Sequence, residues 1–572
     1  MLGVDTDKLY PSAKTLVKEQ VASRLHAKDA TLYSFSEEAQ ECASNFMGWV
    51  DLASNPPYPP EKIQEFAFAA RDMGIDTVVL IGQGGSTQAP MTITKYNKVD
   101  SQKVMFRILD SDSPVRIREL MAECVPEKTM VVVASKSGGT IEPRMVFQAV
   151  REELSDYLTR EELVRHLVAI TDPGSDLERQ AREEGWLEVF NGEPTVGGRF
   201  SALSVFGLVP AALSGIDLAE LMEHAREAER LCSEDSIDNP AINLAAFLFD
   251  NYQNGRDKFC FLTPKRGRVL GLWIEQLVAE SLGKDGKGIL PNIEIDPLML
   301  NVDRGDRSVV VYQTKTDLWD ERKNFEMSMA YVSRTIPRIS YRIESVHELA
   351  AHFVMWEYAI AMCGYLMEVC PFDQPDVASA KAATLDVLKN GHISPDFVEN
   401  DLGGIDMGEI EVRLGQTLKG STSLEEALTM LFQSVEPGDY FALNVFVPFT
   451  GEGRREALEL IRHTAAAEFG MVSCMEIGPR YLHSTGQLQK GGPNNGVFLL
   501  VSADELKDIP LLRAPVPSLA ALAKAQAEGD LATLSSRGRR CIHVHLPDNS
   551  ASTLRQLGEV VHRIAREAAA AR

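Results

Sequence analysis

The chain has 572 residues, of which 44% are hydrophobic and 24% are charged. This composition excludes disorder or a collagen-like structure for most of the chain, and the length leaves room for about three or four domains. With 58 basic and 82 acidic residues, the formal net charge is −24. Nucleic acid and anionic membranes are therefore poor partners, and an anionic ligand would need a local electropositive site.

The cysteines and the apolar runs indicate a cytoplasmic protein. The eight cysteines are scattered and form no Cys-x-x-Cys pair, which favours reduced thiols over a disulfide framework or a zinc site. The first residues lack the charged-then-apolar pattern of a signal peptide. The longest mainly apolar run, 353–369, contains two glutamates and is shorter than the about 20 residues that span a bilayer. We expect a buried helix there and no membrane partner.

The first part of the chain predicts a helical segment followed by an α/β domain. Residues 1–55 are polar and favour helices, and four prolines between 56 and 60 mark a boundary. From 56 to 215, apolar runs alternate with helical stretches. The runs are 77–81, 104–109, 129–134, 167–171 and 188–190. Such alternation predicts a doubly wound parallel sheet that is covered on both faces.

Two further α/β domains are expected. In the second, 216–385, a helical connector precedes the strands 258–263, 308–312 and 338–343 and the helices 272–282 and 346–369. The third, 386–572, has expected strands at 440–446, 497–501 and 541–546 and a closing helix at 552–571. The predicted fold class is α/β, with two doubly wound parallel-sheet domains and a C-terminal α/β domain.

Two glycine-rich turns follow strands of the first expected sheet. Gly82-Gln-Gly-Gly-Ser86 allows close approach of a ligand to the backbone at Gly85 and Ser86, although an empty strand–helix turn would look the same. The second turn, Ser135-Lys-Ser-Gly-Gly-Thr140, offers Ser135, Lys136, Ser137 and Thr140 as donors for a phosphate dianion. Its alternative is an ordinary helix cap at Thr140.

Two stretches carry candidate acid–base groups. Arg199 follows two glycines and could stabilise a developing oxyanion, or it is a surface arginine in a linker. In the helix 272–282, Gln276, Glu280 and Lys284 are spaced to share one face. A glutamate at the carboxyl edge of the sheet would serve as a general base, whereas a solvated Glu–Lys pair is the plainer interpretation.

The remaining candidates lie further along the chain. Gln374 and Lys381 flank a turn and the start of a helix, and His483 lies with Gln487 in a glycine-bounded loop, where a histidine can move protons. Capping and structural roles are the alternatives for these residues. His543 and His545 alternate on a strand and share one face. They could bind a metal, but we expect a solvated strand face. No cluster with metal-ligand spacing is present, and we expect neither a metal nor a cofactor.

Taken together, the motifs resemble the glucose-6-phosphate isomerase family, which is built on sugar isomerase domains. The resemblance covers about 60–385 and lies in five motifs in family order: Gly82–Ser86, Ser135–Thr140, Gly197–Ser201, Gln276–Lys284 and Phe372–Lys381. The tail with His483 resembles the isomerase half of transaldolase–isomerase fusions. No transaldolase half fits ahead of the first motif.

The resemblance implies a role for each matching residue. Glu280 would move a proton between C1 and C2 of the sugar through a cis-enediolate, and Arg199 would stabilise that intermediate. Lys381 and His483 would assist ring opening and proton transfer at the sugar oxygens. The implied substrate contacts are Gly85, Ser86, Ser135, Lys136, Ser137, Thr140, Gln276 and Gln374. The implied reaction interconverts glucose 6-phosphate and fructose 6-phosphate in glycolysis and gluconeogenesis.

The sequence departs from the family in three ways. Gln83 replaces an apolar residue, and Gln88-Ala89 replaces Leu-Gly. The His-x-x-x-Gln stretch follows Lys381 instead of preceding it. The family takes this histidine from a second subunit, whereas we expect the third domain to supply it in cis; a homodimer remains an alternative. Two other functions also remain open: isomerisation of another sugar 6-phosphate, such as mannose 6-phosphate, and non-catalytic sensing of sugar phosphates.

Overall fold

The computed structural model describes residues 10–96, 104–293, 296–315, 319–401, 406–451, 453–512 and 514–572. The chain divides into two compact units. The first unit comprises Met1–Asp110, Glu123–Leu282 and Lys287–Asp373, and the second comprises Ser111–Ala122, Gly283–Gly286 and Gln374–Arg572. The domain boundaries expected at 55, 215 and 385 remain predictions.

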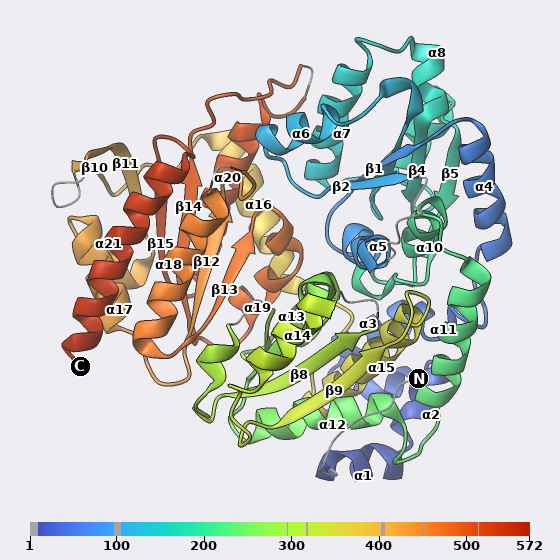
Figure 1. Cartoon of the computed structure of the whole chain (residues 1–572), viewed down its shortest axis with the longest axis horizontal. Coiled ribbons are helices and arrows are strands. Elements are labelled where there is room, and N and C mark those ends of the chain that lie inside the picture. The colour runs from blue at the N-terminus through green and yellow to red at the C-terminus, as the bar shows by residue number, and fades with distance from the viewer. Residues whose placement is uncertain are drawn as a thin grey trace. The chain divides into compact units, whose positions relative to one another are not determined.

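The first unit begins with helices and a five-stranded parallel sheet in the order β2-β1-β3-β4-β5 (Figure 1). Its strands are β1 (Thr77–Ile81), β2 (Met105–Leu109), β3 (Thr129–Ala134), β4 (Leu167–Thr171) and β5 (Glu188–Asn191). The helices up to the end of this sheet are α1 (Pro11–Lys18), α2 (Val21–His26), α3 (Glu37–Phe46), α4 (Pro60–Asp72), α5 (Gly85–Tyr96), α7 (Ile141–Leu154), α8 (Arg160–Leu163) and α9 (Asp176–Glu184). Every residue of β1, β3 and β4 is buried, as in strands that helices cover on both faces.

A second sheet in the same unit has four parallel strands in the order β7-β6-β8-β9. Its strands are β6 (Lys258–Leu262), β7 (Leu290–Asn292), β8 (Arg307–Thr314) and β9 (Arg338–Ile343). The helices before and around it are α10 (Val205–Leu213), α11 (Leu218–Cys232), α12 (Pro240–Gln253), α13 (Arg268–Leu282), α14 (Trp319–Met329) and α15 (Leu349–Met367). Two parallel α/β sheets were expected, and both are confirmed.

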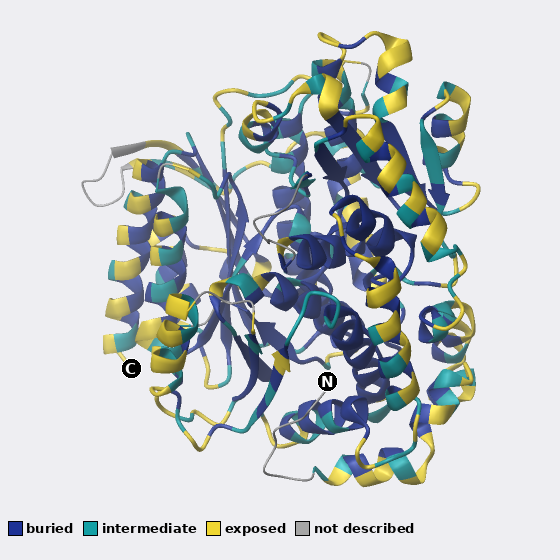
Figure 2. Ribbon diagram, turned by 45° about the vertical axis from the view of Figure 1, so that its right-hand side comes forward, coloured by how far each residue is buried: buried dark blue, intermediate teal, exposed yellow. Residues whose placement is uncertain are grey.

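Helix α15 is the expected buried apolar helix. Among the described residues it alone is long and apolar enough to cross a membrane, and 89% of that stretch is buried within the protein. Trp356 and Phe353 are fully covered and belong to the hydrophobic core of the first unit. Core helices of this kind pass the same test as membrane spans, so α15 is weak evidence for a membrane. Figure 2 shows how much of the helical interior is dark blue, the colour of buried residues.

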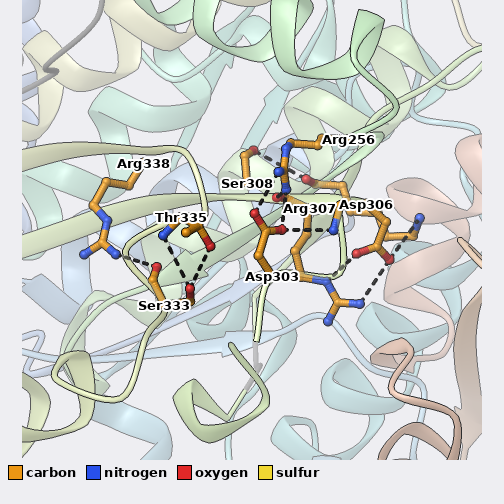
Figure 3. A network of polar contacts seen from close by, with 10 residues as sticks. Arg256, Asp303, Asp306, Arg307, Ser308, Ser333, Thr335 and Arg338 are labelled. Carbon is orange, nitrogen blue, oxygen red and sulfur yellow. Dashed lines mark hydrogen bonds and ion pairs between the residues drawn. The ribbon is translucent and has the colours of Figure 1, made fainter. Parts of the chain in front are cut away.

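The amino ends of the second sheet are tied together by charged side chains (Figure 3). Arg256 binds both carboxylate oxygens of Asp303, at 2.7 and 2.8 Å, and Arg307 donates to Asp306 at 2.6 Å. The Lys258 amine, fully buried, lies 2.5 Å from Asp257 and 3.8 Å from Asp306. A buried cation among carboxylates is costly to remove because its partners lose their compensation.

Replacing Lys258 with methionine is therefore expected to lower the free energy of unfolding by about 3–5 kcal/mol. The matched control is Lys315→Met, because the Lys315 side chain is 67% exposed and pairs with Glu344 at 3.4 Å. This control should change the free energy of unfolding by less than about 1 kcal/mol. Urea denaturation of both variants measures the difference. Equal effects of the two substitutions would contradict a stabilising network at Lys258.

The second unit has one six-stranded sheet in the order β10-β11-β15-β14-β12-β13. Its strands are β10 (Phe397–Asp401), β11 (Asp406–Leu414), β12 (Tyr440–Phe446), β13 (Val472–Ile477), β14 (Gly496–Ala503) and β15 (Arg540–Leu546). Its helices are α6 (Pro114–Met121), α16 (Pro375–Asn390), α17 (Leu424–Gln433), α18 (Arg454–Phe469), α19 (Thr485–Gly491), α20 (Leu519–Ser536) and α21 (Ala551–Ala570). Strands β12 to β15 are parallel to one another, whereas β10 and β11 add an antiparallel edge.

The expectation that His543 and His545 lie on a solvated strand face is wrong. Both side chains are buried, with 0% and 4% of their surface exposed, because β15 is an inner strand and α20 packs against it. The Ser502 hydroxyl lies 2.7 Å from Nε2 of His543 and 2.8 Å from Nδ1 of His545. Burial lowers the pKa of both imidazoles, well below the usual value for His543, so these histidines are neutral parts of the core.

Candidate active site

The two glycine-rich turns meet at one place on the first sheet. After β1 the chain moves to β2 on one side and then returns to β3 on the other. In open α/β sheets, ligands bind outside the carboxyl ends of the strands where the order reverses in this way. Gly82 directly follows β1 and packs closely against the end of β3. A Cβ atom at this position would lie 2.9 Å from the Ala134 carbonyl oxygen. The turns 82–86 and 135–140 thus share this edge.

The turn that carries Arg199 contacts the first of these turns. A side chain at Gly85 would lie 1.9 Å from the carbonyl oxygen of Gly198. Only glycine fits there, because the first residue of α5 meets the backbone of the short 3₁₀ helix Gly198–Phe200. Phe200 holds that helix in place by stacking on Trp49, with ring centroids 4.8 Å apart. The glycine at position 85 therefore serves close packing of backbone on backbone.

Arg199 is fixed by several contacts and is not a surface residue. Its Nε donates to Ser281 Oγ at 2.7 Å, and its Nη2 donates to the carbonyl oxygens of Pro371 and Asp373 at 2.5 and 2.9 Å. Its Nη1 lies 3.7 Å from Oε2 of Glu280. The side chains of Arg199 and Glu280 are only 2% and 9% exposed. The structure thus brings together the two residues that the sequence assigns to charge stabilisation and proton transfer.

The sequence predicts Glu280 at the carboxyl edge of the second sheet, but the structure places it elsewhere. Helix α13 starts after β6 and runs back toward the start of β7, so its last turn, with Glu280, lies away from that edge. Instead, α13 packs against α5 and the Arg199 turn. The expected shared helix face of Gln276 and Glu280 is confirmed, since the Gln276 amide donates to Oε2 of Glu280 at 3.1 Å. Lys284 does not extend this face, because α13 ends at Leu282.

The serine-rich turn after β3 presents hydroxyl groups at the same sheet edge as the first turn. Thr140 precedes α7 but makes no capping hydrogen bond, so the cap interpretation does not hold. Ser137 accepts a hydrogen bond from Gly139 N at 3.2 Å. Lys136 binds the Asp172 carboxylate and also donates to the Glu193 carbonyl oxygen at 3.2 Å. Burial raises the pKa of the Asp172 carboxyl, and the Lys136 amine opposes that rise.

Three of the buried polar atoms that have no hydrogen-bond partner within the part of the chain that the structure describes lie in or just after the two turns. They are Oγ of Ser135, Oε1 of Gln83 and Oε1 of Gln88. Their side chains are 5%, 9% and 2% exposed. Because an unsatisfied buried polar group costs about 1–3 kcal/mol, such atoms favour a site completed by a ligand or water. Sequence reasoning treated Gln83 and Gln88 only as departures from a family pattern, and burial is the signal that it lacked.

The other predicted residues belong to the second unit. Gln374 directly precedes α16, and Lys381 lies on that helix; both are exposed. His483 ends the 3₁₀ helix Arg480–His483 and is half-buried, and this helix packs against α16. The loop expected around His483 and Gln487 is thus partly helical, with Gln487 on α19.

Gln487 fastens α19 within the second unit. Its amide nitrogen donates to the Gly283 carbonyl oxygen at 3.0 Å and to Asp376 at 2.8 Å, and its carbonyl oxygen accepts from Asp376 N at 2.9 Å. These bonds join the segment 283–286, α16 and α19. Gln487 therefore has a positioning role close to His483, while Gln374, Lys381 and His483 keep their assigned roles as predictions.

Comparisons with known proteins agree with these motifs. Residues 67–290 match the family model of phosphoglucose isomerase. The glucose-6-phosphate isomerase of Mycoplasmopsis pulmonis is 29% identical over 389 residues, which cover 60% of this chain and 90% of that protein. The one from Enterococcus faecalis is 28% identical over 430 residues, covering 66% of this chain and 94% of that protein. Over residues 67–290 this chain is therefore similar to phosphoglucose isomerase.

Solved structures agree with the α/β fold of this chain. Hypothetical protein TT0462 from Thermus thermophilus aligns with a TM-score of 0.57 and 24% identity, over 68% of this chain and 100% of that one. A glucose-6-phosphate isomerase from Chlamydia trachomatis aligns with a TM-score of 0.53 and 18% identity, over 68% and 89%. The family match spans the first turn, the serine-rich turn, Arg199 and Glu280.

Proposed function

We propose that this protein interconverts glucose 6-phosphate and fructose 6-phosphate through a cis-enediolate, as an enzyme of glycolysis and gluconeogenesis in the cytoplasm. The single observation that carries the proposal is the buried pair of Glu280 and Arg199, 3.7 Å apart, beside the glycine-rich turn of the first sheet. Aldose–ketose isomerisation needs one base to move a proton, one cation near the developing charge, and donors for the phosphate. The first unit supplies a candidate for each.

Glu280 is the proposed base. Gln276 and Arg199 both contact its Oε2, so we assign proton transfer to Oε1. The carboxylate takes the proton from C2 of the open-chain sugar and returns it to C1, while a second proton moves from O2 to O1. No group is gained or lost. A positioned base of this kind contributes about 10²–10⁴-fold to the rate.

Arg199 is the proposed stabiliser of the enediolate. Its contacts with Ser281, Pro371 and Asp373 hold the guanidinium plane before the substrate arrives. A donor fixed in this way needs no reorganisation when negative charge develops on the sugar oxygens. The charge lies in a water-poor environment, where it acts more strongly than in solvent. Arginine and lysine cations supply this stabilisation without a metal or a cofactor.

The turns 82–86 and 135–140 are the proposed site for the sugar phosphate. Their backbone N–H groups, the start of α5 and the hydroxyls of Ser86, Ser135, Ser137 and Thr140 offer donors to a dianion. Holding the phosphate end lets binding energy orient the reacting carbons. Lys381 and His483 are proposed to assist ring opening, and Gln374 to contact the sugar.

The test is to incubate the purified full chain separately with glucose 6-phosphate and mannose 6-phosphate. Product formation is followed by nuclear magnetic resonance. The proposal expects fructose 6-phosphate from glucose 6-phosphate at a much higher rate than from mannose 6-phosphate. Equal rates would indicate dual specificity and overturn the assigned substrate. Binding of either sugar phosphate without turnover would indicate a sensor.

Lys136→Ala is expected to weaken affinity for phosphorylated ligands, raising KM with little change in kcat, because the lost cation contributes to binding and not to proton transfer. Lys136 also pairs with Asp172, so the matched control is Asp172→Asn, which removes the acid and keeps the amine. The measurement is inhibition by a phosphorylated sugar acid. If both variants lose affinity equally, Lys136 acts by holding the turn and does not bind phosphate.

A further inference from the structure

A second cluster of reactive side chains lies in the first unit, outside the proposed catalytic pair. The sulfur atoms of Cys42 and Cys370 and a carboxylate oxygen of Asp373 all lie within 4.8 Å of one another. Cys42 is on α3, whereas the other two follow α15. Cys370 is buried, and the other two are half-buried. All eight cysteines lie in described parts of the chain, and none forms a disulfide.

Two thiols and one carboxylate form a donor set that suits Zn²⁺. Zinc binds thiolate sulfur at about 2.3 Å and carboxylate oxygen at about 2.0–2.2 Å, in tetrahedral geometry. Ligand atoms around such an ion lie about 3.5–3.8 Å apart, so atoms already within 4.8 Å need only small side-chain movements. Mg²⁺ and Ca²⁺ prefer sites made of oxygen alone, and thiolates select softer metals.

We propose that Cys42, Cys370 and Asp373 bind one Zn²⁺ ion, with water at the fourth position. On binding, the two thiols lose their protons to solvent, and two Zn–S bonds and one Zn–O bond form. No oxidation or reduction takes place. A site with three protein ligands keeps one coordination position open to water. A chelator can reach the zinc through that position, so the proposed zinc acts as a reversible effector of the folded protein.

The site is directly connected to Arg199. Cys370 and Asp373 flank the segment whose Pro371 and Asp373 carbonyl oxygens accept hydrogen bonds from Arg199 Nη2, at 2.5 and 2.9 Å. Drawing the sulfur and the carboxylate toward a metal moves these two carbonyls. The guanidinium then loses part of its support beside Glu280. Zinc binding is thus expected to lower isomerase activity reversibly, a consequence that rests on the proposed function.

Metal binding is tested with Co²⁺, which reports thiolate ligands by a sulfur-to-cobalt charge-transfer band, followed by displacement with Zn²⁺. The full chain is prepared reduced and metal-free. The wild type is expected to show the band at one equivalent, whereas Cys42→Ser and Asp373→Asn lose more than about 10-fold in affinity. Cys124→Ser is the matched control, because this half-buried thiol of the same unit lies outside the cluster. Thermal unfolding of each variant checks that it is folded.

Activity is read in the same samples with and without Zn²⁺ and a chelator. Inhibition of the wild type that the chelator reverses, with resistance in folded Cys42→Ser, supports the whole proposal. A cobalt band that persists in both Cys42→Ser and Asp373→Asn overturns the site. A cobalt band with undiminished activity overturns the connection to Arg199. Absence of isomerase activity in the metal-free wild type would count against the proposed function and leaves the spectroscopic result unaffected.

Discussion

Replacing Glu280 with glutamine is expected to reduce kcat by about 10²–10⁴-fold, the contribution of a positioned general base, while sugar phosphate still binds. Glutamine has the size of the native side chain but cannot accept a proton at neutral pH. The contacts that hold this position, from Gln276 and Arg199, both go to Oε2 and can be made in part by an amide oxygen. Steady-state kinetics and binding of a sugar phosphate inhibitor measure the two quantities separately.

The matched control for this variant is Glu275→Gln. Glu275 lies on the same helix as Glu280 and is also buried. It directly precedes Gln276, which shares a face with Glu280, and adjacent residues on a helix do not share a face. This control should keep kcat within a few-fold of the wild type. Near-normal activity in Glu280→Gln would show that the base has been assigned wrongly.

Replacing Arg199 with lysine should have the second-largest effect. A loss of about 10²–10³-fold in kcat is expected, as when one donor to a developing oxyanion is removed. Lysine keeps the charge but lacks the planar fork with which Arg199 reaches Ser281, the two carbonyl oxygens and Glu280 at once. The comparison of kcat with KM for Arg199→Lys measures this effect, since a donor that acts in the transition state changes kcat more than binding.

Arg151→Lys controls for the loss of a guanidinium elsewhere in the first unit. Arg151 pairs with Glu184 at 2.9 Å, and both side chains are partly exposed. We expect its kcat to stay at the wild-type value. A change in KM alone for Arg199→Lys would mean that this arginine binds the substrate but does not stabilise the intermediate.

Much of the fold could be predicted because the central strands are continuous apolar runs. β1, β3 and β4 have the bounds expected from the sequence, since a strand buried on both faces leaves no polar position to confuse its pattern. The three-residue strand β7 was not predicted, because Pro291 and its short length hide it. Strands β10 and β11, at the antiparallel end of the sheet in the second unit, lie in a polar stretch and were also missed.

The candidate site was predictable only where contacts are local in sequence. Gln276 and Glu280 are one helical turn apart, so their hydrogen bond follows from spacing. The partners of Arg199 do not, since Pro371 and Asp373 come from the end of the first unit. For the same reason, the cluster of Cys42, Cys370 and Asp373 has no signature in the sequence. The burial of His543 could not be predicted either, because it depends on a helix that covers the strand.

Hydrogen exchange at the sugar tests the central claim most directly. Fructose 6-phosphate is incubated in heavy water with the wild type and with Glu280→Gln, and deuterium at C1 is followed by nuclear magnetic resonance. A single carboxylate that moves a proton between C1 and C2 predicts deuterium at C1 with the wild type and almost none with the variant. Equal incorporation by both proteins, or none by the wild type, would contradict proton transfer by Glu280.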